Sequence, residues 1–172
     1  MADAQTSEAL RAQVEAVLEA NRAARAELLT VLDALTDEQH REVWFGTWSL
    51  HELIAHIAAW QDGFALAVEQ MLRGERPAIP GFDSAVDDSE ATDRFNATVA
   101  EGASAKSWET LLSELRSARE RHEAVVRRIP GVLDPDRFVE GRTARRLADS
   151  ANHDREHIDA ILEWRRSKGY RS

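Results

Sequence analysis

Apolar residues recur at helical spacing along most of the sequence, and this periodicity restricts the chain to helices that bury one face. The first such segment runs from about Thr6 to Leu35, with charged residues on the opposite face. One polar residue, Asn21, takes a position that an apolar residue would otherwise hold. If that position is buried, the Asn21 amide needs hydrogen-bond partners. The segment is predicted to form one long amphipathic helix.

The second segment carries boundary signals at both ends. Ser49 and Glu52 form a Ser-x-x-Glu capping box, which predicts the start of a helix. The apolar spacing continues to about Arg73, after which Gly74 and Pro77 favour an end. We therefore expect a second helix from Ser49 to about Arg73.

Two more helical regions follow in the second half of the chain. The third runs from about Asp88 to Arg128 and is weakened at Gly102, with Ser107 as the predicted N-cap of its second half. The last runs from about Thr143 to Lys168. The sequence shows no internal repeat and no convincing strand.

The connection between the second and third helical regions, residues 75–88, is the longest in the sequence. A loop of this length between two long helices favours a crossover over a tight hairpin. We therefore predict an all-α fold, a four-helix bundle with a long crossover connection, in which residues 1–172 form a single domain.

Composition excludes several classes of function. The formal net charge is −9, whereas nucleic-acid binding needs a basic surface. The chain has no cysteine, so thiolate catalysis and cysteine-ligated metal are excluded. The N-terminus shows no secretion signal and no apolar run approaches a membrane span, so we expect a cytoplasmic protein without membrane or nucleic-acid partners.

The strongest chemical motif is the segment 152–157, which reads Asn-His-Asp-Arg-Glu-His. Its histidines, His153 and His157, have i, i+4 spacing, which places both imidazoles on one face of a helix. Zinc normally takes three or four protein ligands, so a third is needed, and His56 on the second helix is our candidate. If the two helices are neighbours, the three imidazoles meet at their shared seam, as in metal sites of bundle cores.

A site of three histidines leaves a position open for water or substrate. Histidine ligands suit zinc, nickel and iron and do not choose among them. The alternative is an ordinary solvated or hydrogen-bonded pair of histidines. The other three histidines (His40, His51 and His122) lie among charged or turn residues, and we expect them at the surface.

Further candidates follow from positions on the helical wheel. Asp154 falls within the apolar stripe, where it would act as an acceptor for an imidazole N–H or for a proton, or form a buried pair with an arginine. Arg146 shares the azimuth of the two histidines, and would hold an anionic substrate group or stay solvated. Three tryptophans would wall a pocket or pack in the core: Trp48, Trp60 and Trp164.

The segment 48–60, from Trp48 to Trp60, resembles the second-helix signature of the DinB/YfiT-like superfamily. The Asn-His-Asp-Arg-Glu-His segment resembles the last-helix signature of the same superfamily. In addition, Pro80-Gly81-Phe82 and Phe95-Asn96 are similar to the ClbS/DfsB branch of related bundles.

The resemblance implies a four-helix bundle, often dimeric, with a divalent metal on three histidines, here His56, His153 and His157. It also implies an enzyme that acts on an electrophilic small molecule, by hydrolysis or by transfer of a low-molecular-weight thiol such as mycothiol or bacillithiol. In this hypothesis Arg146 orients an anion and Asp154 handles a proton. Fold alone does not choose a reaction.

Two other hypotheses stay open at this stage. The first is a self-protection or small-molecule-binding bundle of the ClbS/DfsB kind without an essential metal, in which Trp48, Trp60 and Trp164 matter more than the histidines. The second is a structural or stress-induced bundle, again a possible homodimer, without catalysis.

Overall fold

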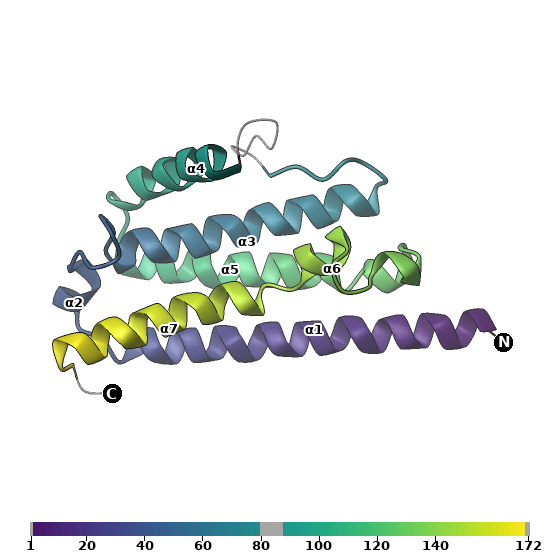
Figure 1. The fold of residues 1–172 in the computed structure, drawn as a ribbon, viewed down its shortest axis with the longest axis horizontal. Helices are drawn as coiled ribbons and strands as arrows, with labels where there is room; N and C mark the ends of the chain where they lie inside the picture. Colours follow the sequence, from purple (N-terminus) through teal and green to yellow (C-terminus); the bar gives the residue numbers. More distant parts are fainter. Residues whose placement is uncertain (1, 80–87, 171–172) are drawn as a thin grey trace.

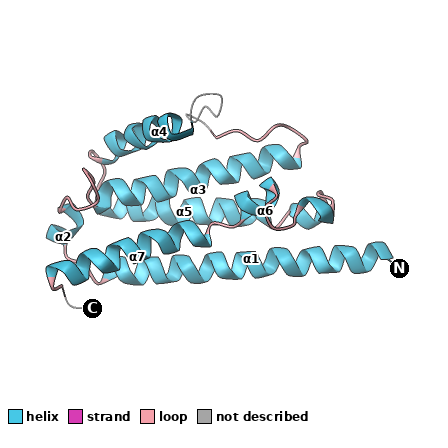
Figure 2. Ribbon diagram, in the orientation of Figure 1, coloured by secondary structure: helices cyan, strands magenta, loops and turns pink. Residues whose placement is uncertain are grey.

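The computed structural model describes residues 2–79 and 88–170, which form helices joined by loops (Figures 1 and 2). Within these described ranges there is no β-strand, only an isolated bridge between Phe45 and Trp48. The predicted all-α class is confirmed. Among the described residues, none of the helices combines the length and the apolar character that a membrane-spanning segment requires. The helices are α1 (Ala2–Asp33), α2 (Asp37–Arg41), α3 (Leu50–Leu72), α4 (Asp88–Ala103), α5 (Trp108–Val126), α6 (Thr143–Ala148) and α7 (Ala151–Lys168).

Four of these helices, α1, α3, α5 and α7, lie side by side as a bundle (Figure 1). The most extensive packing among them is between α3 and α5 and between α1 and α7. The helices α3 and α5 run in the same direction, so the chain must return along the bundle between them. The helix α4 lies in this return segment and packs on α3. The predicted bundle with a long crossover is confirmed.

Two predicted helix starts, each marked by a serine N-cap, are confirmed: Ser49 for α3 and Ser107 for α5. Ser49 accepts a hydrogen bond from the backbone N–H of His51 at 3.2 Å, and the Ser49 N–H donates to Oε2 of Glu52 at 2.8 Å. Ser107 accepts from the N–H of Thr110 at 3.2 Å at the start of α5. These bonds satisfy backbone donors that the first turn of a helix leaves unpaired.

The third helical region, 88–128, is divided into two helices, as the predicted weak point at Gly102 and the predicted N-cap at Ser107 indicate. The helix α4 ends at Ala103, and α5 begins at Trp108 after a short turn. Consequently α4 packs on α3 outside the four-helix bundle and reaches the core only near its end, at Ala103, whereas α5 is one of the four bundle helices. The weakness at Gly102 and the cap at Ser107 mark this division in the sequence.

The last helical region is also divided, because α6 ends at Ala148 and α7 begins at Ala151. The buried Asn21 amide explains the break: its Nδ2 donates to the carbonyl of Ala148 at 2.8 Å, and its Oδ1 accepts from the N–H of Ser150 at 3.0 Å. Two backbone groups at the break thus find partners on α1. The expected partners of Asn21 are present, but the predicted continuous helix over 143–168 is wrong.

The core consists of two apolar clusters separated by a buried polar layer. One cluster joins the second half of α1 to α3, α5 and α7, and the other joins the first half of α1 to the end of α3 and the segments after α5. The polar layer between them contains Asn21, Arg25, Gln61, Arg119, His122, Ser150 and Asp154, each at most 5% exposed. Buried polar groups need hydrogen-bond partners, so this layer fixes the register of the four helices.

Candidate metal centre

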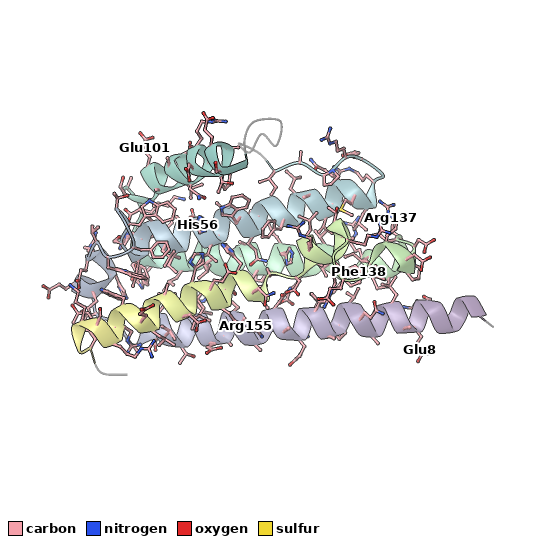
Figure 3. The ribbon with its side chains drawn as sticks, in the orientation of Figure 1. Glu8, His56, Glu101, Arg137, Phe138 and Arg155 are labelled. Atoms are coloured by element: carbon pink, nitrogen blue, oxygen red, sulfur yellow. The ribbon has the colours of Figure 1, made fainter. Side chains whose placement is uncertain are left out.

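The histidine triad, defined as His56, His153 and His157, joins α3 to α7. His56 lies in the second turn of α3, labelled in Figure 3, and its position along the helix follows from the capped start at Ser49. His153 and His157 lie one turn apart on α7, as the i, i+4 spacing predicts. Both His56 and His157 are 8% exposed, and His153 is half-buried.

The three imidazoles converge through their Nε2 atoms. Nε2 of His153 lies 3.2 Å from Nε2 of His56 and 3.1 Å from Nε2 of His157. Nitrogens bound to one tetrahedral zinc ion at about 2.0–2.1 Å lie about 3.3 Å apart, so the observed separations suit a single ion. Within residues 2–79 and 88–170, this is the one group of three or more potential ligands whose ligand atoms all lie within 4.8 Å of one another.

The electrostatic surroundings keep the triad uncharged at neutral pH. Burial, followed by the nearby His153, lowers the pKa of His56 to about 4. Burial and the other two histidines lower the pKa of His157 to about 3, and burial also lowers the pKa of His153. Neutral imidazole is the form that binds metal. A single proton can bridge one pair of these nitrogens, whereas one metal ion would accept all three lone pairs.

The second nitrogen of His56 has a partner on α4. Nδ1 of His56 lies 3.0 Å from Oδ1 of Asn96, which also accepts a hydrogen bond from Nε1 of Trp60 at 2.9 Å. The position of α4 over α3 therefore brings Asn96 to the triad. The sequence drew attention to Asn96 only through the resemblance of Phe95-Asn96 to the ClbS/DfsB branch. It did not assign Asn96 to the site, because the place of this residue depends on the path of the crossover.

Aromatic rings surround the triad on more than one side. Trp48 and Trp60 flank His56 with ring centroids at 5.4 and 6.3 Å, and Phe45 meets the ring of His157 edge-on at 6.1 Å. Phe95 of α4 packs against Trp60 at 4.9 Å. Trp48 and Trp60 thus lie beside His56, and their role as walls of a substrate pocket stays a prediction. Phe95 was noted in the sequence only through the resemblance to the ClbS/DfsB branch, and Phe45 is an addition.

Trp164, for which a pocket wall and core packing were both open, lies in the apolar core. It is 5% exposed and stacks on Trp44 with centroids 4.8 Å apart. It shares the azimuth of His157 but lies two turns further, about 10 Å along the helix axis. The core-packing interpretation of Trp164 is therefore the one that the structure supports.

Asp154 is paired with arginines, which was one of the two interpretations. Both of its oxygens accept from Arg25, from Nη2 to Oδ1 and from Nε to Oδ2, each at 2.9 Å. Oδ2 also accepts from Nη2 of Arg119 at 2.6 Å. In the described contacts, no imidazole N–H donates to Asp154, so its surroundings do not match the expected acceptor beside the metal.

Arg146 lies on α6, whereas its expected place beside the triad assumed a helix continuous with α7. The break at 149–150 removes the shared azimuth. Arg146 is exposed and lines an open surface hollow of about 500 Å³ together with Glu140, Asp149 and Asn152. Arg145 also lines the hollow, so two arginines and two carboxylates balance and the lining offers no net positive charge to an anion.

The expectation that the remaining histidines lie at the surface is wrong. His40, His51 and His122 are 5%, 4% and 0% exposed. His40 stacks on Trp108 with centroids 3.8 Å apart, and His51 approaches the same ring at 5.4 Å. Nε2 of His122 donates to the carbonyl of Leu147 at 2.8 Å. Residues adjacent in the sequence lie on different faces of a helix, so a histidine can be buried although its charged sequence neighbours face solvent.

Comparison with known proteins identified one family. A model of the DinB superfamily matches residues 20–161, which include all three histidines of the triad. Searches of curated proteins and of solved structures found no match. Pro80-Gly81-Phe82, part of the resemblance to the ClbS/DfsB branch, lies outside the described residues. The family match and the triad together indicate a divalent-metal site.

Proposed function

Because this chain belongs to the DinB superfamily, we propose that it is an enzyme that uses a divalent metal ion on His56, His153 and His157 to act on an electrophilic small molecule. The convergence of three Nε2 atoms, at 3.1 and 3.2 Å from the central one, is the observation that carries the proposal. Zinc, nickel and iron all suit such a set of imidazole ligands.

A bound divalent ion would supply Lewis-acid chemistry, either activating a nucleophile or polarising a substrate oxygen. The triad provides three ligands, so a position remains for a molecule from outside the protein. In hydrolysis, a water oxygen forms the new bond to the electrophilic centre. In thiol transfer, a thiol sulfur forms it. In both cases the bond between the electrophilic centre and the leaving group breaks, and the leaving group keeps the electron pair of that bond. The proton of the nucleophile passes to the leaving group or to solvent.

The chain supplies the surroundings of this reaction. It has no cysteine, so a thiol used in the reaction must arrive as a second substrate. The rings of Trp48, Trp60 and Phe45 next to the triad favour a substrate with an apolar part. We assign no proton transfer to Asp154, because both of its oxygens bind arginine.

A second candidate is a self-protection protein that binds a reactive metabolite without an essential metal. The observation that favours it is the ring contact of Trp48 and Trp60 with His56, since aromatic side chains alone hold many apolar ligands. In that case a Trp60→Ala variant would lose protection of cells against the metabolite, whereas a His157→Ala variant would keep it.

The enzyme proposal is tested by activity screens on the purified protein, loaded with zinc, nickel or iron or treated with a chelator. Each sample is incubated with electrophiles such as activated esters and epoxides, with and without a low-molecular-weight thiol, and the products are identified by mass spectrometry. We expect hydrolysis or a thiol adduct only in the metal-loaded protein, and loss of activity in His157→Ala. Activity that survives both the chelator and His157→Ala would overturn the proposal.

A further inference from the structure

The contact between Asn96 and His56 determines which nitrogen of His56 is available. Nε1 of Trp60 can only donate a hydrogen bond, so the atom of Asn96 that lies 2.9 Å from it must be the amide oxygen. The same oxygen lies 3.0 Å from Nδ1 of His56. Because an amide oxygen only accepts, Nδ1 of His56 must carry its proton.

The tautomer follows directly from this assignment. A neutral imidazole carries one proton, so a proton on Nδ1 leaves the lone pair of His56 on Nε2. Nε2 is the atom that faces His153 at 3.2 Å. We propose that Asn96 is a positioning residue that fixes the Nδ1–H tautomer of His56 and so presents its Nε2 to a metal ion.

The role of Asn96 in metal binding rests on the proposed function. The tautomer of His56 does not, because it can be measured in the metal-free protein. Asn96 belongs to α4, which lies outside the bundle and contacts α3. The triad residues themselves belong to α3 and α7. A helix of the crossover therefore completes the site by orienting a ligand, rather than by adding one. Hydrogen-bond partners of this kind set the tautomer, ring orientation and basicity of metal-binding histidines.

Two variants separate the role of Asn96 from a general effect on α4. Asn96→Leu removes the acceptor while keeping a side chain of similar size, and Asn96→Asp keeps an acceptor oxygen. Thr98→Ala serves as a control, because Thr98 is an exposed residue of α4 whose hydroxyl donates to the carbonyl of Arg94 in the same helix.

The first readout is ¹⁵N NMR of the imidazoles in metal-free protein. We expect His56 to show a protonated Nδ1 and an unprotonated Nε2 in the wild type, in Asn96→Asp and in Thr98→Ala, and to lose this preference in Asn96→Leu. Protonated Nε2 in the wild type, or an unchanged tautomer in Asn96→Leu, would overturn the inference whatever the protein binds.

The second readout is the affinity for zinc and cobalt, measured by competition with a chromophoric chelator. We expect Asn96→Leu to bind about 10–100-fold more weakly than the wild type, and Asn96→Asp and Thr98→Ala to stay close to it. Equal affinity in Asn96→Leu would overturn the positioning role. A wild type that has the expected tautomer but binds no metal would instead overturn the proposed function, and leave the tautomer assignment in place.

Discussion

Arg25 of α1 and Asp154 of α7 form a bidentate ion pair in the middle of the bundle, with both N–O distances at 2.9 Å. Arg119 of α5 adds a third bond to the same carboxylate. Two guanidinium groups therefore share one buried negative charge. Burial, followed by the positive charge of Arg25, lowers the pKa of Arg119 to about 10. Asp154 thus supplies the negative charge that allows Arg25 and Arg119 to be buried in the polar layer.

The first prediction concerns removal of this carboxylate charge. Asp154→Asn leaves two buried arginines without a counter-charge, so we expect it to lower the free energy of unfolding by about 3–5 kcal/mol. Asp159→Asn, an exposed change on the same helix, should have little effect. The measurement is urea unfolding of metal-free protein. A stability equal to that of Asp159→Asn would contradict the structural role of Asp154.

The second prediction concerns pH and His122, which is fully buried. Burial lowers its pKa from 6.5 to about 4 in the folded protein. Between these values the unfolded chain binds the proton and the folded protein does not. His122 therefore contributes its full stabilising effect above pH 6.5, and loses it as the pH falls toward 4. The loss amounts to roughly 3 kcal/mol.

A His122→Gln variant isolates this effect, because glutamine does not titrate and can still donate to a carbonyl. The free energies of unfolding of both proteins are measured between pH 7.5 and 4.5. We expect the value for the wild type to fall more steeply than that for His122→Gln, by up to about 1.4 kcal/mol per pH unit. Parallel curves would show that His122 has the same pKa in the folded and unfolded states, and would contradict the lowered pKa of the buried imidazole.

The third prediction concerns the cap that starts α3. Ser49→Ala removes the oxygen that accepts from the N–H of His51, so we expect a loss of about 1 kcal/mol in the free energy of unfolding. Ser113→Ala, at an exposed position inside α5, is the matched control and should be nearly neutral. An equal loss in both variants would argue against a capping role.

The fourth prediction concerns coupling between α4 and the triad. If Asn96 orients His56, then binding of a metal and docking of α4 must strengthen each other by the same free energy. We expect added zinc to slow amide hydrogen exchange in α4, measured by mass spectrometry, in the wild type but not in Asn96→Leu. Zinc that binds the wild type without changing exchange in α4 would show that the two events are independent.

Much of the fold was predictable because its information is local. Helical spacing gave the long amphipathic segments, and the capping residues Ser49 and Ser107 gave two helix starts. The pairing of His153 with His157 follows from a spacing of one turn. The third member, His56, was reached by position on the wheel and by resemblance to the family.

The missed features depend on contacts between residues far apart in the sequence. The break between α6 and α7 is stabilised by Asn21, on a different helix, so the last segment alone reads as continuous. That break moved Arg146 away from the azimuth of the triad. Similarly, the charged neighbours of His40 and His122 lie on other faces of their helices, and sequence context therefore suggested exposure where the structure shows burial.

The central claim is that the triad binds one divalent ion, and elemental analysis by mass spectrometry tests it most directly. The wild type and a His153→Ala/His157→Ala variant are purified, incubated with excess zinc, nickel or iron, and desalted. The account predicts close to one equivalent of metal in the wild type and none in the variant, with similar helix content in both by circular dichroism. No metal in either protein, or equal amounts in both, would contradict it.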